Sequence, residues 1–358
     1  MRLFSTGVMC VVGLSCGLAF AQSGGKLLVV EKGAKALAIV APDSRSDSGS
    51  DSDAVKATVE EGGADKDTGH EVAASHDGKL AYVPIYGNSG VGKPGTDGTE
   101  MVVIDIASGK VVKRVDFRDA FGGKAVRPHL PVMGPRVAGH PEGLLYVTAE
   151  LAKAIAVIDP KTMGIIETIP TGAEQSHMLA VSHDGKRGYT ANVGPGTVSV
   201  LDLTPGAKKN PLAVIPVAGT VPGSVQRISI SNDDKLVFTS DQKKPELDVI
   251  DTATNTLAKR VPMASIGYGS ASTPDGKWLL VALWTANKVA VIDLKTLTEV
   301  HTVDVPAAPQ AVLVRPDGAE AYASCDASGS VAVIDTGSWT VKRVIKVGPV
   351  ADGLAWAK

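Results

Sequence analysis

Cysteine is scarce in the sequence, with three residues among 358. Cys10 and Cys16 lie in an N-terminal segment that we expect to be removed, which leaves Cys325 alone. An exported chain with one cysteine cannot form an internal disulfide, so packing has to stabilise the fold. Cys325 stands in the stretch AYASCDAS, which is typical of a strand, and no histidine and aspartate accompany it in a recognisable motif. We therefore interpret it as a packing residue and not as a nucleophile.

Charge of one sign and aromatic residues are also in short supply. The formal net charge is −2, the lysines are scattered, and Phe, Trp and Tyr make up 4% of the chain. The charge balance argues against the basic surface of a duplex-binding protein, and the few rings argue against a surface that stacks bases. We therefore expect no nucleic-acid partner. Valine, alanine, glycine and threonine are abundant instead, and this mixture suits strands and tight turns.

The N-terminus has the features of an export signal. Arg2 precedes the apolar run Leu3–Phe20, and Ala19-Phe20-Ala21 is a small-x-small pattern of the kind that signal peptidase cleaves. We predict that residues 1–21 are a signal peptide and that the mature protein is periplasmic or extracellular. The run is too short for a stable membrane span, so we expect none in the mature form. Gly13-Leu14-Ser15-Cys16 leaves a lipoprotein alternative open.

The rest of the sequence is a repeat. Six segments with a D-G-type turn, such as AASHDGKLAYV and ASTPDGKWLLV, are each followed by an apolar strand that ends in aspartate. These aspartates are Asp105, Asp159, Asp202, Asp251, Asp293 and Asp335, with spacings of 54, 43, 49, 42 and 42 residues. A period near 42 with four strand-length segments predicts propeller blades, each with strands A to D from the channel outward.

A seventh blade can be assembled from the two ends of the chain. KLLVVEKG from Lys26 and ALAIVAP from Ala36 have the pattern of strands B and C, and AVKATVEEG from Ala54 that of strand D. The C-terminal DGLAWAK has the pattern of a strand A with no strand B after it. We therefore predict an all-β, seven-bladed β-propeller over residues 22–358, closed by the C-terminal strand joining the N-terminal blade, and a monomer.

The segments AYVPIYGN, TVSVLDL and KVAVIDLKTLTEVHTVDV resemble the YVTN-repeat β-propellers. The chain is similar to exported bacterial members of that group and, more distantly, to the lactonase-type seven-bladed propellers. It departs from the usual pattern in an Asp/Ser insert in blade 1, a long loop in blade 2 and extra residues after His129. The resemblance implies the fold but leaves the activity open, because YVTN proteins have diverse roles.

Strand A of each blade begins with a polar residue where the channel opens. Counting back eight residues from each D-G turn gives His70, His177, Gln226, Tyr268 and Gln310, and Asp352 takes the same place in the composite blade. In blade 3, strict counting gives Pro135, beside Arg136, whereas the resemblance places His129 in the ring. Two neighbours of ring residues, Glu71 and Arg227, are expected close by.

This ring suggests three kinds of chemistry. A water-filled polar channel needs no ligand at all. A site for a small molecule, metal or protein partner would use the polar groups that converge from several blades. His70, His129, His177 and Asp352 have the ligand types for a divalent transition metal, although no local motif such as H-x-H supports one.

We predict a non-catalytic binding protein, with a lactonase-like hydrolase as the alternative. In the alternative, a histidine or carboxylate of the ring would activate water, and Arg136 or Arg227 would bind an anionic group. No catalytic residue can be named from the spacing, and no cofactor is expected apart from the possible metal.

Other motifs are better explained by local structure. Gly87-x4-Gly92-Lys93 has the spacing of a nucleotide-binding loop, but Pro94 follows and a strand comes next, so we expect no nucleotide site and instead a mobile flap over residues 87–98. His76 and His183 are interpreted as turn residues on the opposite face. The run Asp43–Asp53 lacks the sixth-position glycine and the terminal glutamate of an EF-hand loop and is expected to be a disordered insert.

Overall fold

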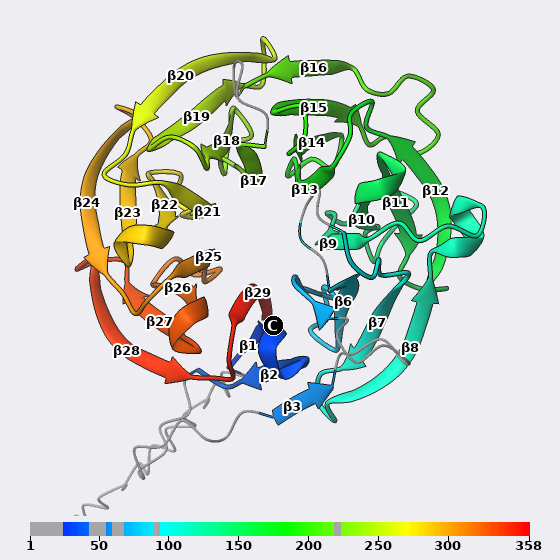
Figure 1. Ribbon diagram of the computed structural model, residues 1–358, viewed down its shortest axis with the longest axis horizontal. Helices are drawn as coiled ribbons and strands as arrows, with labels where there is room; N and C mark the ends of the chain where they lie inside the picture. The colour runs from blue at the N-terminus through cyan, green and yellow to red at the C-terminus, as the bar shows by residue number, and fades with distance from the viewer. Residues whose placement is uncertain (1–23, 43–54, 59–67, 89, 91–93, 218–222) are drawn as a thin grey trace, which may run out of the picture.

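The protein is described by a computed structural model that covers residues 24–42, 55–58, 68–88, 90, 94–217 and 223–358. The predicted signal peptide, with Cys10 and Cys16, and the run Asp43–Asp53 lie outside these residues. Seven β-sheets stand around a central channel in a closed ring (Figure 1). The predicted seven-bladed β-propeller is therefore confirmed. Within the described part of the chain, no helix is long and apolar enough to span a membrane.

The first three blades have the following strands, from the channel outward. Blade 1 contains β29 (Ala351–Ala357), β1 (Lys26–Glu31), β2 (Ala36–Val40) and β3 (Val55–Thr58). Blade 2 has an inner strand in two pieces, β4 (Thr68–Gly69) and β5 (Ala73–Ala74), then β6 (Leu80–Gly87), β7 (Glu100–Asp105) and β8 (Lys110–Asp116). Blade 3 contains β9 (Pro128–Met133), β10 (Leu145–Ala149), β11 (Ala154–Asp159) and β12 (Gly164–Pro170).

The other four blades follow in the order of the sequence. Blade 4 contains β13 (Ser176–Val181), β14 (Arg187–Asn192), β15 (Thr197–Asp202) and β16 (Ala213–Pro216), and blade 5 contains β17 (Val225–Ile230), β18 (Leu236–Asp241), β19 (Glu246–Asp251) and β20 (Thr256–Pro262). Blade 6 contains β21 (Gly267–Ser272), β22 (Trp278–Leu283), β23 (Lys288–Asp293) and β24 (Thr298–Asp304), and blade 7 contains β25 (Pro309–Val314), β26 (Glu320–Cys325), β27 (Ser330–Asp335) and β28 (Thr340–Lys346). Short 3₁₀ turns occur as η1 (Lys32–Ala34), η2 (Arg118–Phe121), η3 (Glu150–Ala152), η4 (Trp284–Ala286) and η5 (Asp326–Ser328).

The ring closes where the last strand meets the first. β29 is antiparallel to β1, with Lys26 opposite Ala357 and Leu28 opposite Ala355 (Figure 1). The ring of Trp356 stacks on Tyr322 of blade 7, with centroids 5.8 Å apart. Because β29 pairs with β1, it is the inner strand of a complete blade, as the two half-patterns of the sequence predict.

The repeated aspartates stabilise the turns at one end of the sheets, on one face of the ring. In the A-to-B turn of blade 2, a carboxylate oxygen of Asp77 accepts hydrogen bonds from the Ser75 hydroxyl at 2.7 Å and the Lys79 amide at 3.1 Å. In the C-to-D turn, Asp105 accepts from the Ser108 amide at 2.8 Å. Short polar side chains that bond to nearby backbone groups favour turns, and this explains why Asp recurs in the A-to-B turns of blades 2 and 4 to 7 and in the C-to-D turns of blades 2 to 7.

The core lies between adjacent blades. Strands B and C are buried on both faces; Val102 and Val103 of β7, for example, have no exposed surface. The outer strands are half exposed, and β8 places four successive side chains from Lys110 to Lys113 in solvent. The sheets therefore pack face to face, while the inner strands have one edge free to line the channel.

Candidate functional site

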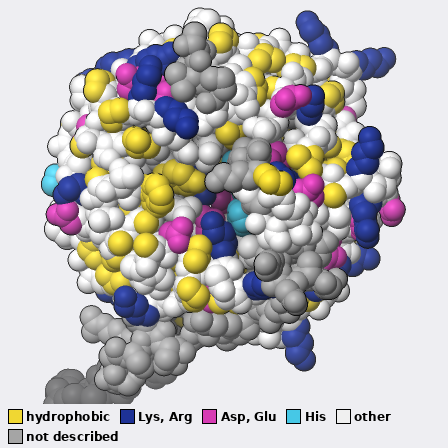
Figure 2. Space-filling model, in the orientation of Figure 1, with side chains coloured by type: hydrophobic (Ala, Val, Ile, Leu, Met, Phe, Trp, Pro, Cys, Tyr) yellow, Lys and Arg dark blue, Asp and Glu magenta, His cyan; other side chains and the backbone are white. Residues whose placement is uncertain are grey.

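The second residue of each continuous inner strand points into one cavity. His129, His177, Gln226, Tyr268, Gln310 and Asp352 hold this position in β9, β13, β17, β21, β25 and β29, and His70 follows β4 directly. All seven line a cavity of about 240 Å³, together with Lys32, Tyr86, Gly90 and Arg227. Figure 2 shows the hollow at the centre of the ring, with basic, acidic and histidine side chains inside it.

A bulge in each of the six continuous inner strands brings these side chains to the cavity. In blade 5, Val225 lies opposite Asp241 but Ile228 lies opposite Thr239, so β17 has one residue more than its partner between these pairs. A bulge bends the strand and changes the direction of the side chains at it. Consequently Gln226 and its neighbour Arg227 both line the cavity, whereas a regular strand would point them to opposite sides.

The structure answers the question that the sequence left open for blade 3. His129 lines the cavity, and Arg136 does not. Arg136 is exposed in the connection between β9 and β10, where the neighbouring Pro135 lies next to Gly185 in the A-to-B turn of blade 4. The placement of Arg136 in the ring is therefore wrong. Counting back failed because the extra residues lengthen the A-to-B connection and do not precede strand A.

A buried network of ion pairs joins side chains that line the cavity to Glu71. Arg227 contacts Glu71 at 2.5 Å and Asp352 at 3.1 Å, and Lys32 contacts the other oxygen of Asp352 at 3.0 Å. Gly353 leaves room for Glu71, because a Cβ at position 353 would lie 2.6 Å from the Cα of Glu71 and 2.8 Å from its carboxylate. We call the cavity the cup and this network of four paired side chains its charged floor.

Burial and the neighbouring cations shift the pKa values of the two floor carboxylates in opposite directions. Burial raises the pKa of Glu71 to about 7, although the neighbouring Arg227 lowers it. Burial also opposes ionisation of Asp352, but Lys32 and Arg227 outweigh it and hold the pKa of Asp352 below its usual value. The guanidinium of Arg227 lies over the ring of Tyr268, 4.9 Å from its centroid. Arg227 therefore has both an ionic and a cation–π partner in place.

Three histidines form the wall of the cup on blades 2 to 4. The rings of His129 and His177 stack with centroids 3.9 Å apart, and His70 lies edge-on to His129 at 5.5 Å. Burial lowers the pKa of His70 to about 3 and that of His129 well below its usual value, so both are neutral at pH 7. Nδ1 of His129 lies 3.2 Å from the backbone carbonyl of His177 and must donate to it, which leaves Nε2 as an acceptor.

Glu150 organises this wall, and our sequence analysis missed it. Its carboxylate is 3.6 Å from Arg127 and accepts hydrogen bonds from Nδ1 of His177 at 2.8 Å and from the hydroxyl of Tyr86 at 2.9 Å. Glu150 is the first residue of η3, directly after strand B, and Lys32 and Asp326 hold the same place in η1 and η5. A charged residue directly after an apolar strand B was the signal that could have found all three.

The four candidate metal ligands do not form a metal site in this arrangement. The planes of His129 and His177 are 19° apart in a stack, so their lone pairs run side by side and do not converge on one ion. Asp352 already contacts Lys32 and Arg227. Among the residues that the structure describes, no three His, Cys, Asp or Glu side chains are placed to hold a metal.

The loop of blade 2 lies beside the cup. Gly90 lines the cavity, and Gly87 and Asp97 pair across the base of the loop. Arg127 donates to Asp97 and to the carbonyl of Gly90, at 2.5 and 3.3 Å. Residues 89 and 91–93 lie outside the described part, and the mobility of the flap stays a prediction. The next element is the strand β7, so the helix that a nucleotide-binding loop requires does not follow.

His76 and His183 lie in A-to-B turns, on the face away from the cup. Nε2 of His76 is 2.8 Å from the carbonyl oxygen of Gly134, and Nδ1 of His183 is 2.6 Å from a carboxylate oxygen of Asp234. Each contact joins the turn of one blade to the next blade. The interpretation of both as turn residues agrees with these positions.

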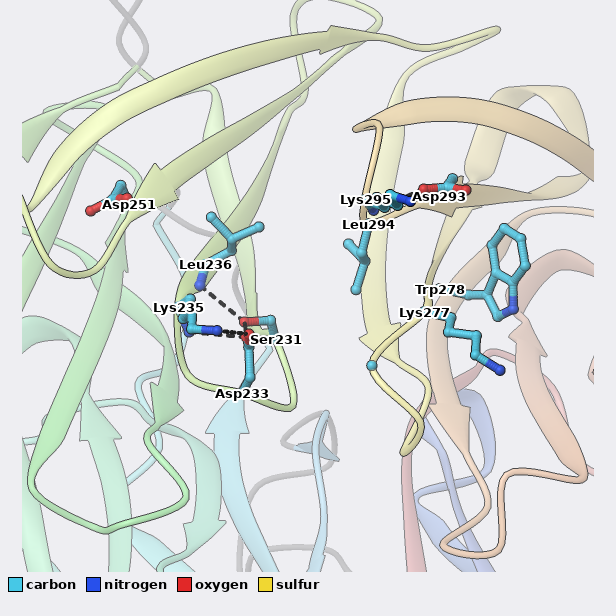
Figure 3. Close-up of a pocket in the computed structure, with 11 residues that line it drawn as sticks. Ser231, Asp233, Lys235, Leu236, Asp251, Lys277, Trp278, Asp293, Leu294 and Lys295 are labelled. Atoms are coloured by element: carbon cyan, nitrogen blue, oxygen red, sulfur yellow. Dashed lines mark hydrogen bonds and ion pairs between the residues drawn. The ribbon is translucent and has the colours of Figure 1, made fainter.

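A larger cavity of about 560 Å³ lies between blades 5 and 6 on this second face (Figure 3). Leu236 and Leu294 stand on opposite walls of it. Its polar groups serve their own turns, since Ser231 bonds to Asp233 and Asp293 accepts from the amide of Lys295. We therefore regard it as a groove between blades, and the smaller cup, where polar groups converge from all seven blades, as the candidate site.

The chain was compared with known proteins. No model of a known protein family matches it. It is similar to the uncharacterized protein YncE of Salmonella typhi and of Salmonella typhimurium, with 28% identity over 233 residues, and the matched part covers 64% of this chain and 64% of those relatives. The activity of those relatives as whole proteins is therefore not transferred to this chain.

Two solved structures share the fold. Hydrazine synthase of Kuenenia stuttgartiensis has a TM-score of 0.64 and 19% identity, covering 84% of this chain and 90% of that one. A streptogramin B lyase has a TM-score of 0.62 and 15% identity, covering 80% of this chain and 86% of that one. At these identities the similarity supports the fold and carries no activity to this protein.

Proposed function

We propose that the protein binds a small polar molecule in the cup at the mouth of its channel and does not transform it. The observation that carries the proposal is the cup itself, in which side chains from all seven blades converge over a floor of paired charges. A cavity of about 240 Å³ is below the range of about 300–1,000 Å³ that holds drug-sized ligands, so the ligand is small. Export and a monomeric state, expected from the sequence, are part of the proposal.

The lining of the cup supports binding without catalysis. Among the described residues, no serine, threonine or cysteine lines it, so a side-chain nucleophile of these types is not in place. The cations of the floor already contact carboxylates, which leaves them poorly suited to stabilise a developing negative charge.

A binding screen tests the proposal. The purified protein is titrated by calorimetry with neutral, anionic and cationic small molecules, and hits are confirmed by saturation-transfer NMR. We expect at least one ligand to bind, and binding to weaken by about tenfold or more in Tyr268→Ala/Gln310→Ala, which removes two side chains that line the cup. Lys277→Ala, exposed on the other face, serves as the control. If no molecule binds, or if the double variant binds as well as the wild type, the proposal fails.

Elemental analysis of the same sample addresses the metal. One equivalent of a transition metal per chain, lost in His70→Ala, would replace this proposal by metal binding through His70, His129, His177 and Asp352. Such binding would require His129 and His177 to leave their stacked arrangement.

A lactonase-like hydrolase is the second candidate, and one contact favours it. His177 donates from Nδ1 to the buried Glu150, which directs the lone pair of Nε2 away from that carboxylate and would let it accept a proton from water. A panel of sugar and homoserine lactones tests this candidate. Hydrolysis that is lost in His177→Ala would support it, whereas lactones left intact at high protein concentration would exclude it.

A further inference from the structure

Every cation around the cup already has a carboxylate partner, and this constrains the ligand that the proposed function would bind. Lys32 and Arg227 face Asp352 and Glu71, so two cations meet two carboxylates. Next to them, Arg127 lies between Asp97 and Glu150. The side chains of Glu71, Asp352 and Arg227 are at most 10% exposed, so water screens them poorly. A charged group on a ligand would find no unmatched counter-charge here and would lose its hydration.

Arg227 and Lys32 have more hydrogen-bond donors than their ion pairs use. A guanidinium has five N–H donors, and Arg227 gives one to Glu71 and one to Asp352. An ammonium has three donors, and Lys32 gives one to Asp352. The remaining donors of both side chains have no acceptor among the described residues. The floor therefore offers donors to a ligand, although both of its cations are paired with carboxylates.

The histidine wall offers acceptors. The neutral His129 bonds through Nδ1 to the carbonyl of His177, and His177 bonds through Nδ1 to Glu150. The neutral His129 therefore keeps the lone pair of Nε2, and the neutral ring of His70 keeps one nitrogen lone pair. Tyr268 adds an aromatic surface to the other side of the cup.

We propose that the ligand is a small neutral polyol. Each hydroxyl group both donates and accepts a hydrogen bond, so one molecule can accept from Arg227 and Lys32 and donate to His70 and His129. The cup has room for about eight water molecules, taking roughly 30 Å³ for each, which suits a chain of about five carbons. This inference rests on the proposed function and narrows it to one class of ligand.

Four ligands of matched size test the inference on the full protein. Xylitol is neutral and hydroxylated, xylonate carries a carboxylate, 1-amino-1-deoxyxylitol carries an ammonium, and pentane-1,5-diol is neutral but lacks the three middle hydroxyls. Affinities are measured by calorimetry and saturation-transfer NMR, because polyols stabilise most proteins as osmolytes and a melting shift alone would mislead. We expect xylitol to bind at least about tenfold more tightly than each of the other three.

Changing the charge of the floor tests whether the pairing of its cations with carboxylates causes the preference for a neutral ligand. Asp352→Asn leaves one of the two cations without a counter-charge, so we expect the ratio of xylonate to xylitol affinity to rise by about tenfold or more. Glu71→Gln should act in the same direction and serves if Asp352→Asn does not fold. Asp304→Asn, which is exposed on β24, should leave the ratio unchanged.

The outcomes distinguish the polyol inference from the broader proposal that the protein binds a small polar molecule. A wild-type preference for xylonate or for the amine overturns the polyol inference and leaves the binding function intact, as does an unchanged ratio in Asp352→Asn and Glu71→Gln. If none of the four ligands binds, the inference is also overturned, and the broad screen then decides separately whether the protein binds another molecule. Preference for xylitol together with the shift in both variants supports the inference.

Discussion

Replacing Arg227 by methionine tests whether the ion-pair network stabilises the floor of the cup. The side chain of Arg227 is 10% exposed, and those of Glu71 and Asp352 are 6% and 2% exposed. Methionine keeps much of the apolar contact but carries no charge. Asp352 would keep Lys32 at 3.0 Å, whereas Glu71 would lose the one cation that forms an ion pair with it among the described residues.

The loss in the free energy of unfolding that we expect for Arg227→Met depends on pH. Removing one partner of a buried ion pair costs about 3–5 kcal/mol, because a charge stays buried without compensation. Burial already raises the pKa of Glu71 to about 7, and loss of Arg227, which lowers this pKa, will raise it further. Between the ordinary pKa of 4.5 and the raised value, the folded protein binds a proton that the unfolded chain releases, so stability falls as the pH rises through this window.

Urea unfolding at pH 5 and pH 8, followed by circular dichroism, measures the effect. We expect Arg227→Met to lose about 3 kcal/mol at pH 8 and clearly less at pH 5. Arg227→Met/Glu71→Gln removes the orphaned carboxylate and should recover at least half of the loss. Arg187→Met is the control, since this guanidinium is 44% exposed and 3.6 Å from Asp202, and it should cost less than about 1 kcal/mol.

Two results would refute this reasoning. One is a loss below about 1 kcal/mol for Arg227→Met at pH 8, which would mean that the buried pair is solvated or replaced. The other is a double variant no more stable than the single one, which would mean that the loss comes from packing and not from the orphaned charge of Glu71.

Three further predictions concern the same region. Gly353→Ala should cost about 1–3 kcal/mol in thermal unfolding, because its Cβ would lie 2.6 Å from the Cα of Glu71, and an unchanged melting temperature would contradict this. Tyr86→Phe removes a hydrogen bond to the buried Glu150 and should cost about 1–3 kcal/mol in urea unfolding; a cost near zero would show that the bond contributes nothing. Deleting residues 351–358 removes the inner strand of blade 1, so the single cooperative transition should be lost, and a deletion variant that melts like the full chain would disprove the closure.

The ring and its closure were predictable because their signals are local and repeated. Each D-G turn, and each aspartate at the end of strand C, bonds to backbone groups within a few residues, as Asp77 does with Lys79 and Asp105 with Ser108. The same pattern repeats along the chain, so one unclear copy does not hide it. The half-patterns at the two ends identified the composite blade for the same reason.

The ring of polar residues was partly predictable. Counting from the turns placed His70, His177 and Gln226 on the inner strands, and the structure brings them to one cavity. The count failed in blade 3, where a longer A-to-B connection separates the turn from the strand and leaves Arg136 in solvent. A fixed spacing can locate a residue only where no insertion lies between it and the turn that is counted from.

The sequence by itself determined the strands, their order and the closed ring, because hydrophobic alternation and turn chemistry act over a few residues. The tertiary structure alone decided how the cup is built. Arg227 meets Glu71, 156 residues away, and Asp352, 125 residues away, and Glu150 of blade 3 contacts His177 of blade 4. These contacts depend on the bulge in each continuous inner strand and on the angle between blades, and neither leaves a mark in the repeat.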